Sequence, residues 1–501
     1  MRRIPLQCTI VLIATIISLL PFPSHSKDPS GAPYPALAGV RYGISVTDLD
    51  GNILVDHRAH ERFMPASNVK LFVTAAALAA ESQISALDTG LRVIAEETEA
   101  GPPTLILAGR GDPTIGAGTE CSVRCIAALA AMVAETGIKD VGDIIGDDQW
   151  FADEPRPLGW SWDDLKFGHG TSISAIAVND NVIPMRVAPS GDKGASARAW
   201  WVDPNQTYFT LNNEAKTGDA AGEKALRLER RIGERTARLY GELPLGSKSL
   251  KLDLGVDDPA HFAAWQFRKA LEAEGVSVSG TLRTRRRPLH YADEPISSDP
   301  SNEDSPLKCR QRVGAAPDKN VVASLPSASL QEIVDEINRE SHNLYAEVLV
   351  RQLGRASGTG SSFCGLLQIQ ELLDEVGVDR TSYDIADGSG LSNYNRATPA
   401  TITALLRHAA TAPWGEAYRA SLPVSGASNG TLKSRFRGSA LEGKVFAKTG
   451  TLNHADALSG YMEAASGQTL VFSIIVNDRP LDSPSSAPLI DASLLEIAEQ
   501  H

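Results

Sequence analysis

The segment from Phe63 to Ala80 constrains the fold more than any other part of the chain. Pro65 and Ser67 suit the start of a helix, and the Ala- and Leu-rich residues behind them are strong helix formers. The resulting helix is apolar on nearly every face, and such a helix must be surrounded by protein. The sequence therefore predicts a buried helix within a domain core.

Changes in local composition along the sequence divide the chain into one split domain and a long insertion. At 501 residues the chain is too long for a single ordinary domain. Between residues 86 and 316, Gly, Pro and charged residues are scattered among short strand-like pieces such as 105–108 and 199–202. We therefore expect an α/β (α+β) chain whose main domain combines residues 27–85 and 317–501, with a mainly β-containing insertion over 86–316.

Local patterns predict the elements of the main domain. Asp50-Gly51 separates two strand-like stretches, 42–49 and 52–55, and this arrangement predicts a β-hairpin. Helices are expected over 329–352, with a polar break near Ser341, and over 363–376 and 488–499. Apolar runs predict strands over 443–452 and 470–476.

The N-terminus has the three-part layout of a secretory signal peptide. Arg2 and Arg3 are followed by an apolar run over 9–20 and by small residues at Ser24 and Ser26. Residues 1–26 are therefore predicted to be a signal peptide, cleaved after Ser26, which would place the protein in the periplasm or outside the cell. An uncleaved membrane anchor is the alternative, but the apolar run is short for a membrane span.

The net charge and the cysteine content limit which classes of partner and cofactor the chain can bind. The formal net charge of −13 at pH 7 argues against nucleic acid and anionic lipid as partners, because both need a basic surface. Cys121, Cys125, Cys309 and Cys364 can form two disulfide bonds at most in an exported protein, and the sequence leaves their pairing open. Cys121 and Cys125 stand four apart, as zinc ligands sometimes do, but no partner cluster of Cys or His with metal-ligand spacing accompanies them, so we expect no metal and no cofactor. The oligomeric state is not predicted.

Ser67-Asn68-Val69-Lys70 is the first of three motifs that indicate chemistry. Residues three apart share a face of a helix, so Lys70 can reach the Ser67 hydroxyl and accept its proton once burial lowers the pKa of the amine. The alternative is a helix-capping serine beside a surface lysine. The same spacing recurs in the signal tail and in polar loops, at Ser24–Lys27, Ser190–Lys193 and Ser305–Lys308.

Two further motifs follow in the C-terminal part of the chain. The triplet 341–343, Ser-His-Asn, places a hydroxyl and an amide at the expected helix break, where both can face a cleft; a simple polar turn is the alternative. The triplet 448–450, Lys-Thr-Gly, lies in an expected strand, where an amine and a hydroxyl can bind a carboxylate and a glycine lets a ligand approach the strand edge. A second Lys-Thr-Gly triplet, 216–218, lies in a turn-like stretch, and we interpret it as unrelated to the site.

In this order the three motifs resemble those of the serine penicillin-recognising enzymes. Flanking runs narrow the resemblance to the D-alanyl-D-alanine carboxypeptidase/endopeptidase family of class C low-molecular-mass penicillin-binding proteins (peptidase family S13), from about residue 43 to 477. These runs are Pro65-Ala-Ser-Asn-Val-Lys-Leu, Gly109-Arg-Gly-Asp-Pro-Thr, Ser341-His-Asn-Leu-Tyr-Ala-Glu, Asp387-Gly-Ser-Gly-Leu-Ser, Gly430-Thr-Leu and Ala447-Lys-Thr-Gly-Thr-Leu. The resemblance implies a transpeptidase/β-lactamase-like domain, an antiparallel sheet flanked by helices, which the insertion splits after the nucleophile helix.

The resemblance also implies catalytic roles. Ser67 would attack the carbonyl of the penultimate D-alanine, and Lys70 would act as the general base. Ser341 would relay protons to the leaving group, and Asn343 would hold a substrate amide. Water would then release the acyl group, whereas penicillin would mimic the dipeptide and remain on Ser67.

Substrate binding is implied for the 448–451 strand and for one acid of the insertion. Lys448 and Thr449 would bind the terminal carboxylate, and Gly450 would let the substrate backbone approach. The backbone N–H of Thr451, with that of the nucleophile, would form the oxyanion hole. Family members also carry an acidic residue near the active-site lysine, and Asp180 is the only acid in the matching stretch 177–181.

Asp387 and Arg435 match family positions too and are expected to shape the cleft. The expected ligands are peptidoglycan peptides and β-lactams, and the balance between carboxypeptidase and endopeptidase action is left open. Two rival functions remain. A β-lactamase or esterase would need a route for rapid deacylation, and the sequence offers no convincing glutamate for it. A non-catalytic cell-wall-binding protein would have no need to keep Ser67, Lys70 and Lys448.

Overall fold

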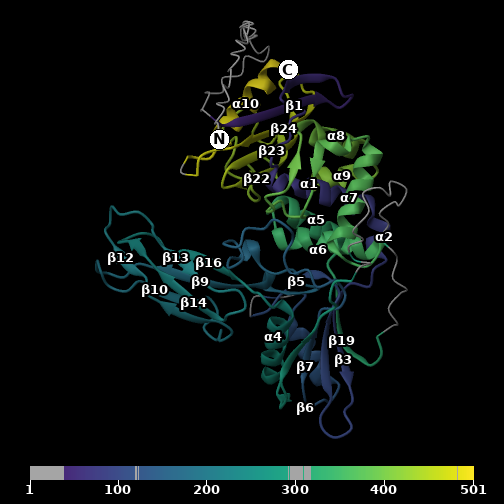
Figure 1. Ribbon diagram of the computed structural model, residues 1–501, viewed down its shortest axis with the longest axis vertical. Coiled ribbons are helices and arrows are strands. Elements are labelled where there is room, and N and C mark those ends of the chain that lie inside the picture. The colour runs from purple at the N-terminus through teal and green to yellow at the C-terminus, as the bar shows by residue number, and fades with distance from the viewer. Residues whose placement is uncertain are drawn as a thin grey trace, which may run out of the picture. The chain divides into compact units, whose positions relative to one another are not determined.

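The computed structural model describes residues 39–501 except 119, 120, 122, 291, 292, 294–308, 310–317 and 482. The signal peptide predicted at residues 1–26 lies outside this range. Among the described residues, no helix is long and apolar enough to cross a membrane. Figure 1 labels many of the helices and strands.

One five-stranded antiparallel sheet contains strands from both ends of the described chain, in the order β2-β1-β24-β23-β22. β1 (Arg41–Asp48) and β2 (Ile53–His57) form the predicted hairpin, and β1 pairs along its length with β24 (Thr469–Asn477). β23 (Ala455–Glu463) separates β24 from β22 (Val445–Leu452), which is therefore an edge strand. The purple and yellow strands of Figure 1 thus share one sheet.

The predicted apolar helix is α1 (Val69–Ala79), preceded by a single 3-10 turn at Ala66–Asn68. Every residue of α1 except Ala79 is buried, which confirms the prediction. The helices that surround α1 are α5 (Leu330–Arg339), α6 (Asn343–Ser357), α7 (Ser362–Val376), α8 (Pro399–Thr411) and α9 (Gly415–Ser421). α8 also packs on β1, β23 and β24, and α10 (Ala487–Gln500) packs on β23.

The predicted break near Ser341 separates α5 from α6. Ser341 has a φ of +65°, in the left-handed region where a helix cannot continue. α5 therefore ends at Arg339, and α6 begins at Asn343. The break leaves Asn343 on the first turn of a new helix that packs against α1.

The described insertion contains several separate sheets and the helices α3 (Ile126–Glu135) and α4 (Pro259–Ala273). The largest sheet has the order β18-β7-β4-β3-β19 and is covered by α3 and α4. Its strands are β3 (Gly90–Glu96), β4 (Thr104–Gly109), β7 (Ile144–Asp147), β18 (Leu282–Arg285) and β19 (Val321–Pro326). A second sheet has the order β10-β9-β16, from β9 (Val182–Ala188), β10 (Arg198–Trp201) and β16 (Leu250–Gly255).

β19 lies after residue 317, yet it pairs antiparallel with β3. The sheet of the insertion therefore takes one strand from the segment assigned to the main domain, and the boundaries at 85, 86, 316 and 317 stay a prediction. The remaining short elements are α2 (Glu81–Ser85), β5 (Asp112–Ile115), β6 (Asp140–Val141), β8 (Ile176–Val178), β11 (Thr210–Asn213), β12 (Lys216–Gly218), β13 (Arg227–Glu229), β14 (Thr236–Tyr240), β15 (Glu242–Pro244), β17 (Ser277–Val278), β20 (Tyr383–Asp384) and β21 (Arg396–Ala397).

The structure resolves the pairing of the four cysteines. Cys121 is bonded to Cys125, and Cys309 is bonded to Cys364 on α7. The first bridge closes a short loop before α3, and the second ties Cys309, near the C-terminal end of the expected insertion, to α7. No group of His, Cys, Asp and Glu side chains in the described residues could hold a metal ion.

Candidate active site

Ser67 and Lys70 lie at the start of the buried helix and contact each other. The Lys70 Nζ lies 2.9 Å from the Ser67 Oγ. The Lys70 side chain is fully buried, whereas Ser67 is partly exposed. Ser67 makes no capping hydrogen bond, and the N-cap position of α1 belongs to Asn68. The alternative of a capping serine beside a surface lysine is therefore wrong.

The Lys70 amine has two further partners, and both are acceptors only. It donates to the Asn343 Oδ1 at 2.8 Å and to the backbone carbonyl of Ser389. The Asn343 amide is itself held in orientation, because its Nδ2 donates to the His169 carbonyl at 3.0 Å. The predicted motifs at 67–70 and 341–343 are thus brought together by α1 and α6.

Burial decides the protonation state of Lys70. Loss of hydration lowers the pKa of Lys70 to about 7, from an ordinary value of 10.5, although the nearby carboxylates of Asp387 and Glu347 act to raise it. An amine with such a pKa is largely unprotonated just above neutral pH. It can therefore accept a proton from the adjacent hydroxyl.

Lys448 occupies the edge strand β22 and is also fully buried. Its Nζ donates to the Thr449 carbonyl at 3.0 Å, and the Thr449 hydroxyl donates to the Thr431 Oγ1 at 2.9 Å. Burial, and next the positive charge of Lys70, hold the pKa of Lys448 well below its ordinary value. The two amines therefore lie close enough for the charge of Lys70 to act on Lys448.

A hydrogen bond joins the residue before α1 directly to β22. The Asn68 Nδ2 donates to the Lys448 carbonyl at 3.1 Å. A Cβ at Gly450 would lie 2.9 Å from the Pro65 carbonyl oxygen and 3.1 Å from the Ala66 Cβ, so a larger residue would push the strand away. The glycine of the Lys-Thr-Gly triplet therefore has a packing role next to the serine.

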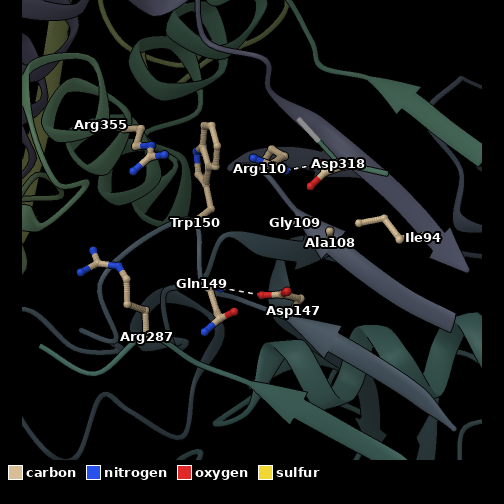
Figure 2. Close-up of a pocket in the computed structure, with 10 residues that line it drawn as sticks. All are labelled: Ile94, Ala108, Gly109, Arg110, Asp147, Gln149, Trp150, Arg287, Asp318 and Arg355. Atoms are coloured by element: carbon tan, nitrogen blue, oxygen red, sulfur yellow. Dashed lines mark hydrogen bonds and ion pairs between the residues drawn. The ribbon is translucent and has the colours of Figure 1, made fainter. Parts of the chain in front are cut away.

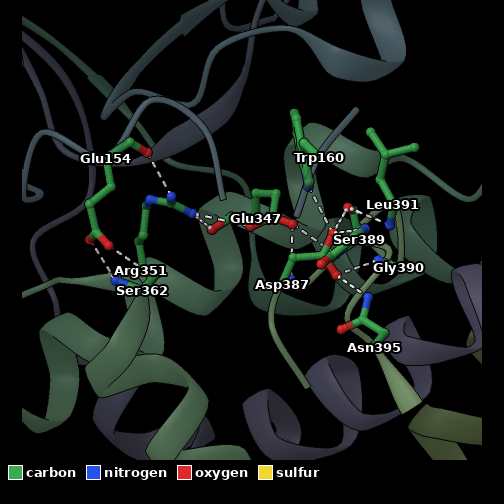
Figure 3. Close-up of polar contacts among 12 residues, drawn as sticks. Glu154, Trp160, Glu347, Arg351, Ser362, Asp387, Ser389, Gly390, Leu391 and Asn395 are labelled. Atoms are coloured by element: carbon green, nitrogen blue, oxygen red, sulfur yellow. Dashed lines mark hydrogen bonds and ion pairs between the residues drawn. The ribbon is translucent and has the colours of Figure 1, made fainter. Parts of the chain in front are cut away.

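A loop at 387–392 packs against the residues before α1. The Asp387 carboxylate accepts hydrogen bonds from the loop's own N–H groups at Gly390 and Ser392, both at 2.9 Å, and from the Trp160 Nε1 at 2.9 Å (Figure 3). Gly390 has a φ of +85°, and a Cβ there would lie 2.0 Å from the Ala66 carbonyl oxygen. Asp387 thus holds its own loop, which packs against the backbone next to Ser67, and its expected role in shaping the cleft stays a prediction.

Glu347 was missed by the sequence analysis. Its carboxylate is fully buried and accepts from the backbone N–H groups of Gly388 at 2.9 Å and Ser389 at 2.8 Å. Burial first, and the charge of Asp387 second, raise the pKa of Glu347 to about 7. Glu347 follows Asn343 by four residues and therefore shares its face of α6, a signal that could have been used.

Other predicted residues lie around the cluster without joining it. The Ser341 hydroxyl forms no hydrogen bond with the described residues, and its role stays a prediction. The Thr451 side chain is exposed and donates to Asp456 at 3.1 Å. The Asp180 carboxylate lies 3.4 Å from the His342 Nε2, beside the helix break. Arg435 pairs with Asp491 on α10.

A second Ser-x-x-Lys tetrad, 190–193, and a second Lys-Thr-Gly triplet, 216–218, lie next to each other in the insertion, but the lysine of this tetrad is not buried. Lys216-Thr217-Gly218 forms β12, paired with β15, so the expectation of a turn was wrong. The Ser190 Oγ lies 3.0 Å from the Thr217 Oγ1. Lys193 is exposed, and its pairing with Asp219 at 2.6 Å raises the pKa of the lysine, so it stays charged. This contrast supports the choice of the 67–70 motif.

A separate cavity of about 420 Å³ contains none of these site residues in its described lining. The Trp150 ring lies in this cavity between the guanidinium groups of Arg110 and Arg355 (Figure 2). Its ring centroid is 4.4 Å from the Cζ of Arg110 and 4.2 Å from the Cζ of Arg355. Arg110 is ion-paired with Asp318 within the same lining. We assign no ligand to this cavity.

The comparison with protein families matches almost the whole chain. The model of the D-Ala-D-Ala carboxypeptidase 3 (S13) family matches residues 30–307 and 310–499. A D-alanyl-D-alanine carboxypeptidase of Actinomadura sp. (strain R39) is 34% identical over 486 residues, which cover 93% of this chain and 82% of that protein. The D-alanyl-D-alanine carboxypeptidase DacB of Haemophilus influenzae is 22% identical over 88% of this chain and 86% of its own length.

The fold matches that of a solved relative. The crystal structure of penicillin binding protein 4 from Haemophilus influenzae superposes with a TM-score of 0.73 at 21% identity, over 91% of this chain and 95% of that one. The same protein complexed with a β-lactam gives a TM-score of 0.68 at 19% identity, over 92% and 95% of the two chains. The expected transpeptidase/β-lactamase-like fold is therefore confirmed.

Proposed function

The chain belongs to the D-Ala-D-Ala carboxypeptidase 3 (S13) family, and from this premise we propose how its own residues carry out the reaction. It is a serine-type hydrolase that removes the terminal D-alanine from peptides ending in D-alanyl-D-alanine. The observation that carries the proposal is the buried Lys70 amine, 2.9 Å from the Ser67 hydroxyl, with a pKa lowered to about 7.

Acylation begins with transfer of the Ser67 proton to Lys70. A neutral amine has two hydrogens and one lone pair. Because the Asn343 oxygen and the Ser389 carbonyl only accept, they take the two hydrogens and leave the lone pair facing Ser67. The serine oxygen then forms a bond to the carbonyl carbon of the penultimate residue, and the bond to the terminal D-alanine nitrogen breaks as that nitrogen receives a proton. Water completes the hydrolysis.

Lys448 recognises the free carboxylate of the substrate. The amine is buried beside the positive charge of Lys70, and both conditions disfavour its charged form in the free enzyme. A substrate carboxylate would reverse this preference and raise the pKa of Lys448 again. Thr449, whose side chain is partly exposed next to Lys448, supplies a hydroxyl for the same carboxylate. We therefore expect substrate binding to be accompanied by proton uptake.

Release of D-alanine tests the proposed function. The purified chain is expected to release D-alanine from a peptide ending in D-alanyl-D-alanine, and preincubation with penicillin is expected to stop this release. A peptide ending in L-alanine serves as the control and should stay intact. Absence of D-alanine release, together with absence of a penicillin adduct, would overturn the proposal.

The pH dependence of acylation follows from the lowered pKa of Lys70. Below about pH 7 the amine is an ammonium and has no lone pair for the serine proton. The rate constant for acylation by a fluorescent penicillin should therefore rise with pH and level off above about 7. A profile that continues to rise toward the ordinary lysine value of 10.5 would contradict the assignment of Lys70 as the base.

Replacing Lys448 by alanine is expected to weaken recognition of the carboxylate. A hydrogen bond to a charged group contributes about 2–3 kcal/mol, so kcat/KM for the peptide should fall by roughly 30- to 150-fold. For a peptide with an amidated C-terminus the same substitution should have little effect. Lys444→Ala is the matched control, because Lys444 precedes the same strand but pairs with Glu463 at 2.8 Å. Equal losses on both peptides would contradict carboxylate binding.

We further propose that the protein is exported and acts on peptidoglycan peptides. The predicted signal peptide over 1–26 and the two disulfide bonds both suit an oxidising compartment outside the cytoplasm. The acidic net charge is consistent with small peptides and β-lactams as ligands rather than nucleic acid.

A further inference from the structure

A buried carboxylate lies close to the proposed general base, and no hydrogen bond among the described residues joins it to Ser67. Glu347 is fully buried on α6, one turn after Asn343. A single oxygen, Oε1, accepts from the N–H groups of Gly388 and Ser389, at 2.9 and 2.8 Å. Ser389 is the residue whose carbonyl accepts from Lys70. One carboxylate oxygen therefore holds the backbone that carries this carbonyl.

The second oxygen of Glu347 is occupied by an arginine. The Arg351 Nη1 lies 3.2 Å from the Glu347 Oε2, and both side chains are 1% exposed. The Arg351 Nη2 donates to the Glu154 carbonyl at 2.8 Å, and the Glu154 carboxylate accepts from the Ser362 N–H at 2.8 Å. Buried ion pairs of this kind contribute little net stability compared with apolar residues, so stability alone is a weak reason for this one.

We infer that Glu347 is a positioning residue for acylation. It fixes the Ser389 carbonyl where that carbonyl takes one hydrogen of the neutral Lys70 amine, and this directs the lone pair toward Ser67. Without the carboxylate, the 388–389 backbone has no acceptor for two buried N–H groups and must move to find one. The inference rests on the proposed function, because it presupposes Lys70 as the base.

The charges around the two groups are compatible with this role. Lys70 lies among the carboxylates of Asp387 and Glu347 and the amine of Lys448. Glu347 faces Asp387 from the loop and Arg351 from its own helix. Asp387 holds the other side of the same loop through the Ser389 hydroxyl at 2.7 Å. Glu347 thus holds the Ser389 peptide N–H, and Asp387 holds the Ser389 hydroxyl.

A pair of double variants separates positioning from general destabilisation. Arg351→Gln accompanies each change at Glu347, so that no buried guanidinium is left without a partner. Glu347→Gln keeps an oxygen for the two N–H groups, whereas Glu347→Met has similar length and no acceptor. The measured quantities are the rate constant of acylation by a fluorescent penicillin at saturation, the concentration for half-maximal rate, and the thermal unfolding midpoint.

The Gln variant is expected to acylate within about tenfold of the wild-type rate constant. The Met variant should be slower by about 100-fold, with an unchanged half-saturating concentration, because misplacing a reacting group affects the chemical step. A control pair in the insertion, Arg230→Gln with Asp257→Asn, removes an ion pair whose arginine is buried and whose carboxylate is 13% exposed, and it should leave the rate constant unchanged.

Two results would overturn the inference. One is equal acylation rate constants in the Gln and Met variants. The other applies if the Met variant does not fold: Glu347→Asp, which keeps the charge but withdraws it by one methylene, should then lower the rate constant by about tenfold, and a wild-type value would contradict positioning. A wild-type protein that is not acylated at all would instead refute the proposed function, so the two failures are distinguishable.

Discussion

Ser67→Ala is expected to lower the turnover of a D-alanyl-D-alanine peptide by about 10⁴- to 10⁶-fold, the largest effect of any single substitution. The Ser67 Oγ is the hydroxyl 2.9 Å from the buried Lys70 amine, and alanine offers no atom that could form the acyl bond. The substitution removes only a partly exposed oxygen, so the fold and the affinity for the peptide should be nearly unchanged.

The control for this prediction is Ser190→Ala. Ser190 belongs to the other described Ser-x-x-Lys tetrad and lies beside Thr217 of the second Lys-Thr-Gly triplet. Because Lys193 is exposed and paired with Asp219, this serine has no base, and its loss should leave turnover at the wild-type value. A marked loss of turnover in Ser190→Ala, together with wild-type turnover in Ser67→Ala, would contradict the assignment of Ser67 as the nucleophile.

Lys70→Arg should slow acylation by about 10²- to 10⁴-fold, the loss typical of removing a general base. Arginine keeps the positive charge but does not lose its proton in proteins, so it cannot accept the proton of Ser67. The rise of the rate with pH near 7 should disappear in this variant, because it arises from the lowered pKa of Lys70.

The measurement for Lys70→Arg is the rate constant of acylation by a fluorescent penicillin across the pH range, with the thermal unfolding midpoint as a check on folding. Lys193→Arg is the matched control and should behave as wild type, since Lys193 is an exposed surface lysine. A Lys70→Arg protein that is acylated at the wild-type rate would show that another group takes the serine proton.

Local patterns predicted the parts of the fold that depend on neighbouring residues. The Asp50-Gly51 hairpin, the apolar helix α1 and the break at Ser341 all follow from turn chemistry, helix propensity and a polar interruption. The motif at 67–70 was recognisable for the same reason, since both residues lie on one helical turn.

Features that depend on contacts between residues far apart in the sequence could not be predicted from local patterns. The role of Glu347 arises only when the 387–392 loop packs against α6, which no local pattern encodes. The cysteine pairing depends on the path of the chain between Cys309 and Cys364. Lys216-Thr217-Gly218 becomes a strand because β15 pairs with it, although its neighbours are typical of a turn.

The most direct test of the account is peptide mapping by mass spectrometry after treatment of the full chain with penicillin. We predict one adduct with the mass of the intact penicillin, on the peptide that contains Ser67, and none in Ser67→Ala. An adduct on another serine, such as Ser190 or Ser341, or no adduct on a protein that still hydrolyses the peptide, would contradict it.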